Sequence, residues 1–360
     1  MRYLTNPLSI PARRFVTVVI FLIGISGCSG EGGGSGPPAN QAPVAFNSCE
    51  YDSGVNQPFN GTLVATDPEG QSLTYSIVGI ASNGSAQVTN PLTGAFTYTP
   101  NTNTRGTDTF TFRACEAAPS TVCSNVATYK IVHTPRIMPL GDSITEGDGS
   151  GDPDNLLVGY RKPLKEALTA AGYVTDFVGT QNSGSSLFTD SEHEGHGGFT
   201  ADQINGSNGS FLTNLLNNTA SMPDVVLLHI GTNDISTSGG FNIIDVNDVE
   251  NILDTIDSWE ASNWPVTVVI SRIITNQQFE PSVTTSFNDA VKTMVLGRTT
   301  DLLEWVDHQA NVSVTTDYSD LLHPNTNGYQ KMTDVWRYPL TGSGTASGNH
   351  SGPGILPKCP

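Results

Sequence analysis

Five apolar runs from residue 136 onward alternate with stretches whose apolar residues repeat at helical spacing. The runs are predicted to be strands at residues 136–140, 174–178, 225–230, 266–270 and 303–306. The helical repeats are Tyr160, Leu164 and Leu168, and then Val249, Ile252, Leu253 and Ile256. Repeated strand and helix units predict a parallel sheet with helices on both faces, which is a three-layer α/β/α domain. We assign residues 135–340 to it.

The pattern between residues 43 and 134 is different, because short segments alternate apolar and polar side chains. Phe96–Thr99 and Phe110–Arg113 show this alternation, and turn clusters such as Asp67–Gly70 separate such segments. Short alternating strands with turns between them predict a small all-β sandwich. Asp67 and Glu69 carry hard oxygen ligands, so weak calcium binding by this sandwich is an open interpretation.

The first 27 residues have the form of a lipoprotein signal peptide. Arg13 and Arg14 precede an apolar run at residues 15–25, which is too short for a membrane-spanning helix of about 20 residues. Ile25–Cys28 then has the form of a lipobox, so Cys28 is expected to be lipidated and to anchor the chain to a membrane. Residues 28–42 are rich in Gly, Ser and Pro and form a linker. Ser29 indicates sorting to the outer membrane of a Gram-negative bacterium, on its periplasmic or cell-surface face.

Charge and cysteine content agree with an exported protein. The 34 acidic and 16 basic residues give a net charge of -18, which excludes nucleic acid as a partner because phosphate binding needs a basic patch. Four cysteines remain after Cys28, an even number that predicts disulfides in an oxidising compartment. Cys115 and Cys123 flank a short hairpin-like loop and are paired first. Cys49 and Cys359 are then left as a tie between the sandwich and the tail at residues 341–360, which we expect to be extended.

Candidate catalytic residues stand in separate loops. Ser143 follows the first predicted strand at a turn into a helix, which is a nucleophile's position, although Gly-Asp-Ser is also ordinary turn chemistry. Asn233 follows the third predicted strand. Parallel sheets bind ligands beyond the carboxyl ends of their strands, so both residues are expected at a site.

Four ordered motifs carry a family resemblance: Gly141–Gly147, Glu194–Thr200, Gly231–Asp234 and Asp320–Asn325. The chain thereby resembles the SGNH hydrolases, or GDSL esterases and lipases, whose marker residues match Ser143, Gly198, Asn233 and His323. A closer likeness is to carbohydrate esterase family 3, the acetyl xylan esterases, through Met138–Gly147, Gly159–Arg161, Asp176–Gly179 and His193–His196. The resemblance implies a flavodoxin-like domain. The sandwich resembles cadherin-like and bacterial immunoglobulin-like modules.

The roles expected of these residues are those of a serine esterase. Ser143 attacks the ester, His323 is its general base, and Asp320 orients the imidazole. The backbone N–H groups of Ser143 and Gly198 and the side-chain amide of Asn233 form the oxyanion hole. No metal or cofactor is expected. The substrate is a small-molecule or polysaccharide ester, with acetylated xylan as one example.

Several alternatives compete with this interpretation. Asp190 and His193 have the same three-residue spacing as Asp320 and His323, but the family places its base after the last strand, which favours the later pair. His229 lies in an apolar strand and is expected in the core. A broad short-chain carboxylesterase, or lipase-like GDSL enzyme, is the second functional reading. A non-catalytic surface glycan-binding or adhesion lipoprotein is the third.

Overall fold

The computed structural model describes residues 39–360 except residues 53, 55, 150–156 and 300. The expected signal peptide, the lipidation site Cys28 and most of the linker lie outside the described residues. Within the described part of the chain, no helix combines the length and the apolar character needed to cross a bilayer.

The first domain is an all-β sandwich, as predicted. Its strands are β1 (Val44–Ala45), β2 (Ser48–Tyr51), β3 (Phe59–Thr62), β4 (Ala65–Thr66), β5 (Leu73–Gly79), β6 (Gly84–Asn90), β7 (Ala95–Pro100), β8 (Thr107–Glu116) and β9 (Ala127–Val132). They form sheets of order β2-β9-β8-β5 and β3-β7-β6, and β1 pairs with β4. Phe110 stacks on Tyr129 at 5.3 Å between ring centroids, and Phe96 meets both rings edge-on. These rings form the core because alternate positions of each strand face inward.

Both disulfides have the pairing that the sequence suggested. Cys115 is joined to Cys123 and Cys49 to Cys359. The calcium interpretation stays a prediction. Asp67 accepts the N–H groups of Glu69 and Gln71, and no group of three or more His, Cys, Asp or Glu side chains among the described residues is arranged to hold a metal.

The second domain contains a parallel sheet of flavodoxin-like order. Its strands are β10 (Arg136–Gly141), β11 (Asp176–Phe177), β12 (Glu194–Gly195), β13 (Val225–His229), β14 (Thr267–Arg272) and β15 (Leu303–Asp307). The order is β11-β10-β13-β14-β15, and β12 pairs with β10 beyond β11. The strand expected at residues 174–178 is shorter than predicted, because it lies at the edge of the sheet and Val174 is exposed. The pattern did not predict β12.

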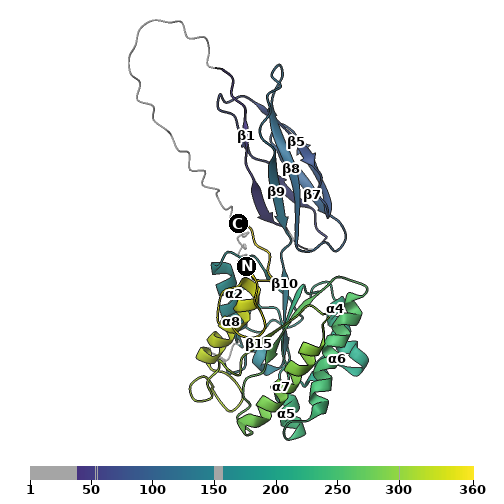
Figure 1. The fold of residues 1–360 in the computed structure, drawn as a ribbon, viewed down its shortest axis with the longest axis vertical. Coiled ribbons are helices and arrows are strands. Elements are labelled where there is room, and N and C mark those ends of the chain that lie inside the picture. Colours follow the sequence, from purple (N-terminus) through teal and green to yellow (C-terminus); the bar gives the residue numbers. More distant parts are fainter. Residues whose placement is uncertain (1–38, 53, 55, 150–156, 300) are drawn as a thin grey trace, which may run out of the picture. The chain divides into compact units, whose positions relative to one another are not determined.

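Helices cover both faces of this sheet (Figure 1). They are α1 (Ser143–Glu146), α2 (Arg161–Ala170), α3 (Ala201–Asn205), the 3-10 turn at Ser207–Gly209, α4 (Ser210–Asn217), α5 (Thr232–Ser238), α6 (Ile243–Glu260), α7 (Pro281–Gly297) and α8 (Thr326–Thr341). Residues of α2 and α8 pack in one apolar cluster, and residues of α3, α4, α6 and α7 pack in the other. The expected helical faces of α2 and α6 are buried.

The C-terminal tail packs on the edge of the sheet rather than running free. The backbone N–H of Trp305 donates to the side-chain oxygen of Asn349 (2.7 Å), and the N–H of Asn349 donates to the carbonyl of Trp305 (3.2 Å). Ser347 accepts the N–H of Asp307. The tail therefore satisfies edge groups of β15 that would otherwise face solvent.

Candidate active site

Ser143 is the first residue of α1 and directly follows β10. The carboxylate of Asp142 caps this helix by accepting the N–H of Ile144 (3.0 Å). Asp142 is fully buried, and burial raises the pKa of its carboxyl to about 6. Asp142 therefore holds the turn that presents the serine.

His323 lies beside Ser143, and Asp320 lies behind His323. The Oγ of Ser143 is 2.9 Å from Nε2 of His323, and Nδ1 of the same ring is 2.8 Å from Oδ2 of Asp320. The other carboxylate oxygen, Oδ1, accepts the N–H groups of Leu322 (2.6 Å) and His323 (2.7 Å). Burial raises the pKa of Asp320, but the hydrogen bonds from the ring and from these amides outweigh it and lower the pKa. An ionised Asp320 can thus fix the imidazole with Nε2 toward the serine.

The loop that contains Gly198 contacts the side chain of Asn233. Gly198 has a φ of 80°, a left-handed conformation that glycine adopts without strain. The Nδ2 of Asn233 donates to the carbonyl of Phe199 (3.0 Å), and the N–H of Ala201 donates to Asp234 (2.9 Å). A side-chain amide carries two N–H groups, so the contact with Phe199 orients Asn233 and leaves its second N–H for another acceptor.

The strand order explains why these residues converge. Ser143 follows β10 and Asn233 follows β13, and these two strands are neighbours at the point where the sheet order reverses. Ligands in open parallel sheets bind at such a switch point, beyond the carboxyl ends of the strands. The N–H of His196 donates to the carbonyl of Gly141 (2.9 Å), which attaches the loop containing Gly198 to the end of β10.

The competing pair, Asp190 and His193, has a different environment. Asp190 accepts the N–H of Phe177 (3.0 Å) and forms an ion pair with Lys165. His193 is fully buried, and the N–H of Gly195 donates to its Nδ1 (2.9 Å). Burial and the nearby charge of Arg161 lower the pKa of His193 to about 2. The backbone N–H groups of Ser183 and Gly195 thus face the two ring nitrogens of His193.

His229 is also buried, as expected, and burial lowers its pKa to about 3.

Arg161 was not identified as a functional residue from the sequence, although it ends one of the family-like phrases. Its guanidinium is fully buried and donates to five backbone carbonyls. These carbonyls belong to Thr145, Glu146, Leu157, Ser183 and Ser191. Burial lowers its pKa to about 10, so it is still a cation near neutral pH. Arg161 thereby holds the carbonyl end of the helix that begins with Ser143.

Asp148 was also missed. Its Oδ2 lies 3.8 Å from Nε2 of His323, and 45% of its side chain is exposed. Its carbonyl accepts the hydroxyl of Tyr329 (2.6 Å), and its N–H donates to the carbonyl of Ser143 (3.0 Å). The backbone therefore holds a carboxylate next to the ring nitrogen that faces the serine.

Comparison of the chain with known proteins identifies the families of its two domains. The model of the GDSL-like lipase/acylhydrolase family matches residues 140–331, more than half of the chain, and that of the bacterial Ig domain matches residues 40–128. A multidomain esterase from Ruminococcus flavefaciens is 28% identical over 230 residues, which are 58% of this chain and 29% of that protein. This chain thus spans less than a third of the length of that relative.

Two solved structures are also similar. A family 3 carbohydrate esterase from Clostridium thermocellum is 34% identical, with a TM-score of 0.48, and the match covers 57% of this chain and 94% of that chain. One from Talaromyces cellulolyticus is 26% identical, with a TM-score of 0.46, and the match covers 56% and 93%.

Proposed function

Because the chain belongs to the GDSL-like lipase/acylhydrolase family and is an ester hydrolase, we propose that it removes acetyl groups from a carbohydrate by a Ser143, His323 and Asp320 mechanism. The observation that carries the mechanism is the continuous contact from Ser143 Oγ to His323 Nε2 (2.9 Å) and from His323 Nδ1 to Asp320 (2.8 Å). Nucleophile, base and orienting carboxylate thus stand in the sequence that acyl transfer requires.

The reaction proceeds in two halves. Ser143 Oγ attacks the ester carbonyl while its proton passes to Nε2 of His323, and the carbonyl oxygen becomes an oxyanion. The N–H groups of Ser143 and Gly198 and the side chain of Asn233 donate to it. The intermediate collapses to an acyl-enzyme, and the leaving alcohol takes the proton from His323. A water molecule, deprotonated by His323, then attacks the acyl-enzyme and releases acetate and free Ser143.

A carbohydrate leaving group is supported by the phrases similar to carbohydrate esterase family 3 and by Asp148. Its carboxylate is half exposed and stands beside the nitrogen that returns the proton to the alcohol. A hydroxyl next to the ester on a sugar ring can donate to such an acceptor, and hydrogen bonds to charged groups are the stronger ones. A simple alkyl or aryl alcohol has no such hydroxyl.

The test is a panel of acetylated glycans, including acetylated xylan, and p-nitrophenyl esters of increasing acyl length. The proposal expects acetyl esters of sugars to have the highest kcat/KM, with a decline from acetyl to longer acyl groups. A broad short-chain carboxylesterase would instead hydrolyse the aryl esters and leave the glycans acetylated. An absence of hydrolysis across the whole panel would favour a glycan-binding role.

We also propose that the chain is lipid-anchored at Cys28, on the basis of the lipobox at Ile25–Cys28. Acyl chains would then supply most of the membrane affinity. The test is incorporation of labelled fatty acid into the parent and into Cys28→Ala. Equal labelling of both proteins would overturn the proposal.

A further inference from the structure

The bridging loop, defined as residues 273–280 between β14 and α7, lies between the two halves of the site. The oxyanion donor Asn233 is on α5, and the base His323 is on the loop at residues 317–325, some ninety residues later in the chain. Their separation determines whether one carbonyl can meet both groups. Shifts of about 1 Å in such geometry cost about 100-fold in rate.

On one side, the bridging loop contacts the helix of Asn233 through Asn276. The Nδ2 of Asn276 donates to the Oγ of Ser236 (2.9 Å) and to the carbonyl of Thr232 (3.4 Å), the residue before Asn233. Ser236 in turn donates to the same carbonyl (3.0 Å). Asn276 is only 1% exposed, and its Oδ1 accepts the N–H of Gln278 (2.9 Å). Its buried amide is thus fully committed to the loop and to α5.

On the other side, neighbours of Asn276 contact the loop at residues 317–325, which carries His323 and is called the base loop below. The carbonyl of Thr275 accepts the hydroxyl of Tyr318 (2.7 Å), and the N–H of Gln277 donates to the carbonyl of Leu321 (3.0 Å). Leu321 lies between Asp320 and His323. Three consecutive residues, 275–277, therefore contact both α5, which carries Asn233, and the base loop, which carries His323.

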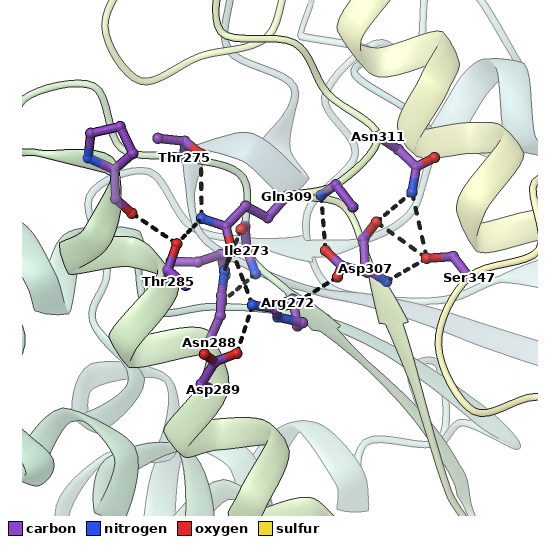
Figure 2. A network of polar contacts seen from close by, with 12 residues as sticks. Arg272, Ile273, Thr275, Thr285, Asn288, Asp289, Asp307, Gln309, Asn311 and Ser347 are labelled. Atoms are coloured by element: carbon purple, nitrogen blue, oxygen red, sulfur yellow. Dashed lines mark hydrogen bonds and ion pairs between the residues drawn. The ribbon is translucent and has the colours of Figure 1, made fainter.

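The start of the bridging loop is itself held by a polar network (Figure 2). The side chain of Asn288 accepts the N–H of Ile273 and donates to its carbonyl, both at 2.9 Å. Gln309 donates to Thr285 (3.0 Å) and accepts from Asn288 (3.1 Å). Arg272, at the end of β14, contacts Asp289 (2.8 Å) on α7 and Asp307 on β15. The start of the loop is thus attached to α7, and Arg272 joins the end of β14 to α7 and β15.

We propose that Asn276 is a positioning residue that sets the placement of Asn233 relative to His323. Loss of its two donor bonds frees the first turn of α5 while the base loop stays attached through Thr275 and Gln277. The oxyanion donor then points less accurately at the developing charge, which is a loss specific to the transition state. The inference rests on the roles proposed above for Asn233 and His323.

The test is a double-mutant cycle on kcat for p-nitrophenyl acetate. Asn276→Ala is expected to lower kcat about 10-fold with KM changed less than about twofold. In the Asn233→Ala background, where the donor is already gone, the same change is expected to lower kcat less than about threefold. Residues that act through one group are non-additive in this way.

Multiplicative losses in that cycle would overturn the proposal, because a general structural role acts equally in both backgrounds. Full activity of Asn233→Ala by itself would instead overturn the proposed function. The matched control is Asn205→Ala, a buried amide of α3 that accepts the hydroxyl of Thr255 (2.7 Å). It is expected to lower the Tm and leave kcat unchanged.

If Asn276→Ala does not fold, Ser236→Ala carries the same test. It removes the hydroxyl that accepts from Asn276 on a half-buried side chain of α5. A loss of about threefold in kcat that disappears in the Asn233→Ala background supports the proposal, and a loss that persists there contradicts it.

Discussion

Two pairs of residues have the same Asp-x-x-His spacing, Asp190 with His193 and Asp320 with His323. The two histidine rings differ in burial and in the groups that contact them. His193 is fully buried, and backbone N–H groups approach its ring. The Nδ1 of His323 contacts the carboxylate of Asp320, and its Nε2 contacts the hydroxyl of Ser143. The same Asp-x-x-His spacing therefore occurs in a pair whose ring faces backbone N–H groups and in a pair whose ring contacts a serine hydroxyl. The groups that face the two ring nitrogens distinguish the pairs.

The largest difference between the two pairs is expected when the contact between Ser143 and His323 is removed. Ser143→Ala and His323→Ala are each expected to lower kcat by about 10⁴-fold or more, because the serine is not nucleophilic without its base. The double variant should be scarcely worse than either single one, since the two residues act as a unit. Steady-state kinetics with p-nitrophenyl acetate measure this, and a His323→Ala enzyme with a tenth of the parent rate would exclude His323 as the base.

A smaller loss is expected from the oxyanion hole. Asn233→Ala should lower kcat by about 100- to 1,000-fold with little change in KM, because its amide serves the oxyanion more than the ground-state carbonyl. Circular dichroism should show an unchanged fold. An increase in KM at constant kcat would instead assign Asn233 to substrate binding.

A variant of Asp148 tests whether the surroundings of His323 also include a group that contacts the leaving alcohol. Asp148→Asn is expected to lower kcat/KM about 5-fold for an acetylated sugar and less than about 2-fold for p-nitrophenyl acetate, since only the sugar can donate a hydroxyl to the carboxylate. The parent and the variant are compared on both substrates. Equal losses on both would mean that Asp148 acts on His323 rather than on the substrate.

His193 should have the smallest effect on chemistry. His193→Gln is expected to keep kcat within about threefold, because glutamine can still accept one of the two backbone N–H groups. The depressed pKa of His193 gives stability that is present above the unfolded value of about 6.5 and is lost as the pH falls toward about 2.

The variant should therefore lose less stability than the parent between about pH 6.5 and pH 4.5, by at most about 1.4 kcal/mol per pH unit. Urea unfolding at the two pH values measures this. Loss of turnover in folded His193→Gln would transfer the role of base to His193.

The sequence patterns predicted the elements that depend on local order, and the motifs supplied the candidate site residues. Alternating apolar runs predicted the strands, and turns after β10 and β13 indicated Ser143 and Asn233. The contacts of Arg161 and Asn276 could not be predicted from the sequence, because their partners are carbonyls and hydroxyls of other segments of the chain. Only the sheet order brings such segments together. The strand β12 was missed for another reason, because its two residues are too few to form an apolar pattern.

Activation of Ser143 by His323 can be measured by covalent labelling with a fluorophosphonate, followed by mapping of the labelled peptide by mass spectrometry. One label is expected, on Ser143, in the parent and in His193→Gln, and the rate of labelling is expected to fall by several orders of magnitude in His323→Ala. A label on another serine, or undiminished labelling of Ser143 in folded His323→Ala, would contradict this expectation.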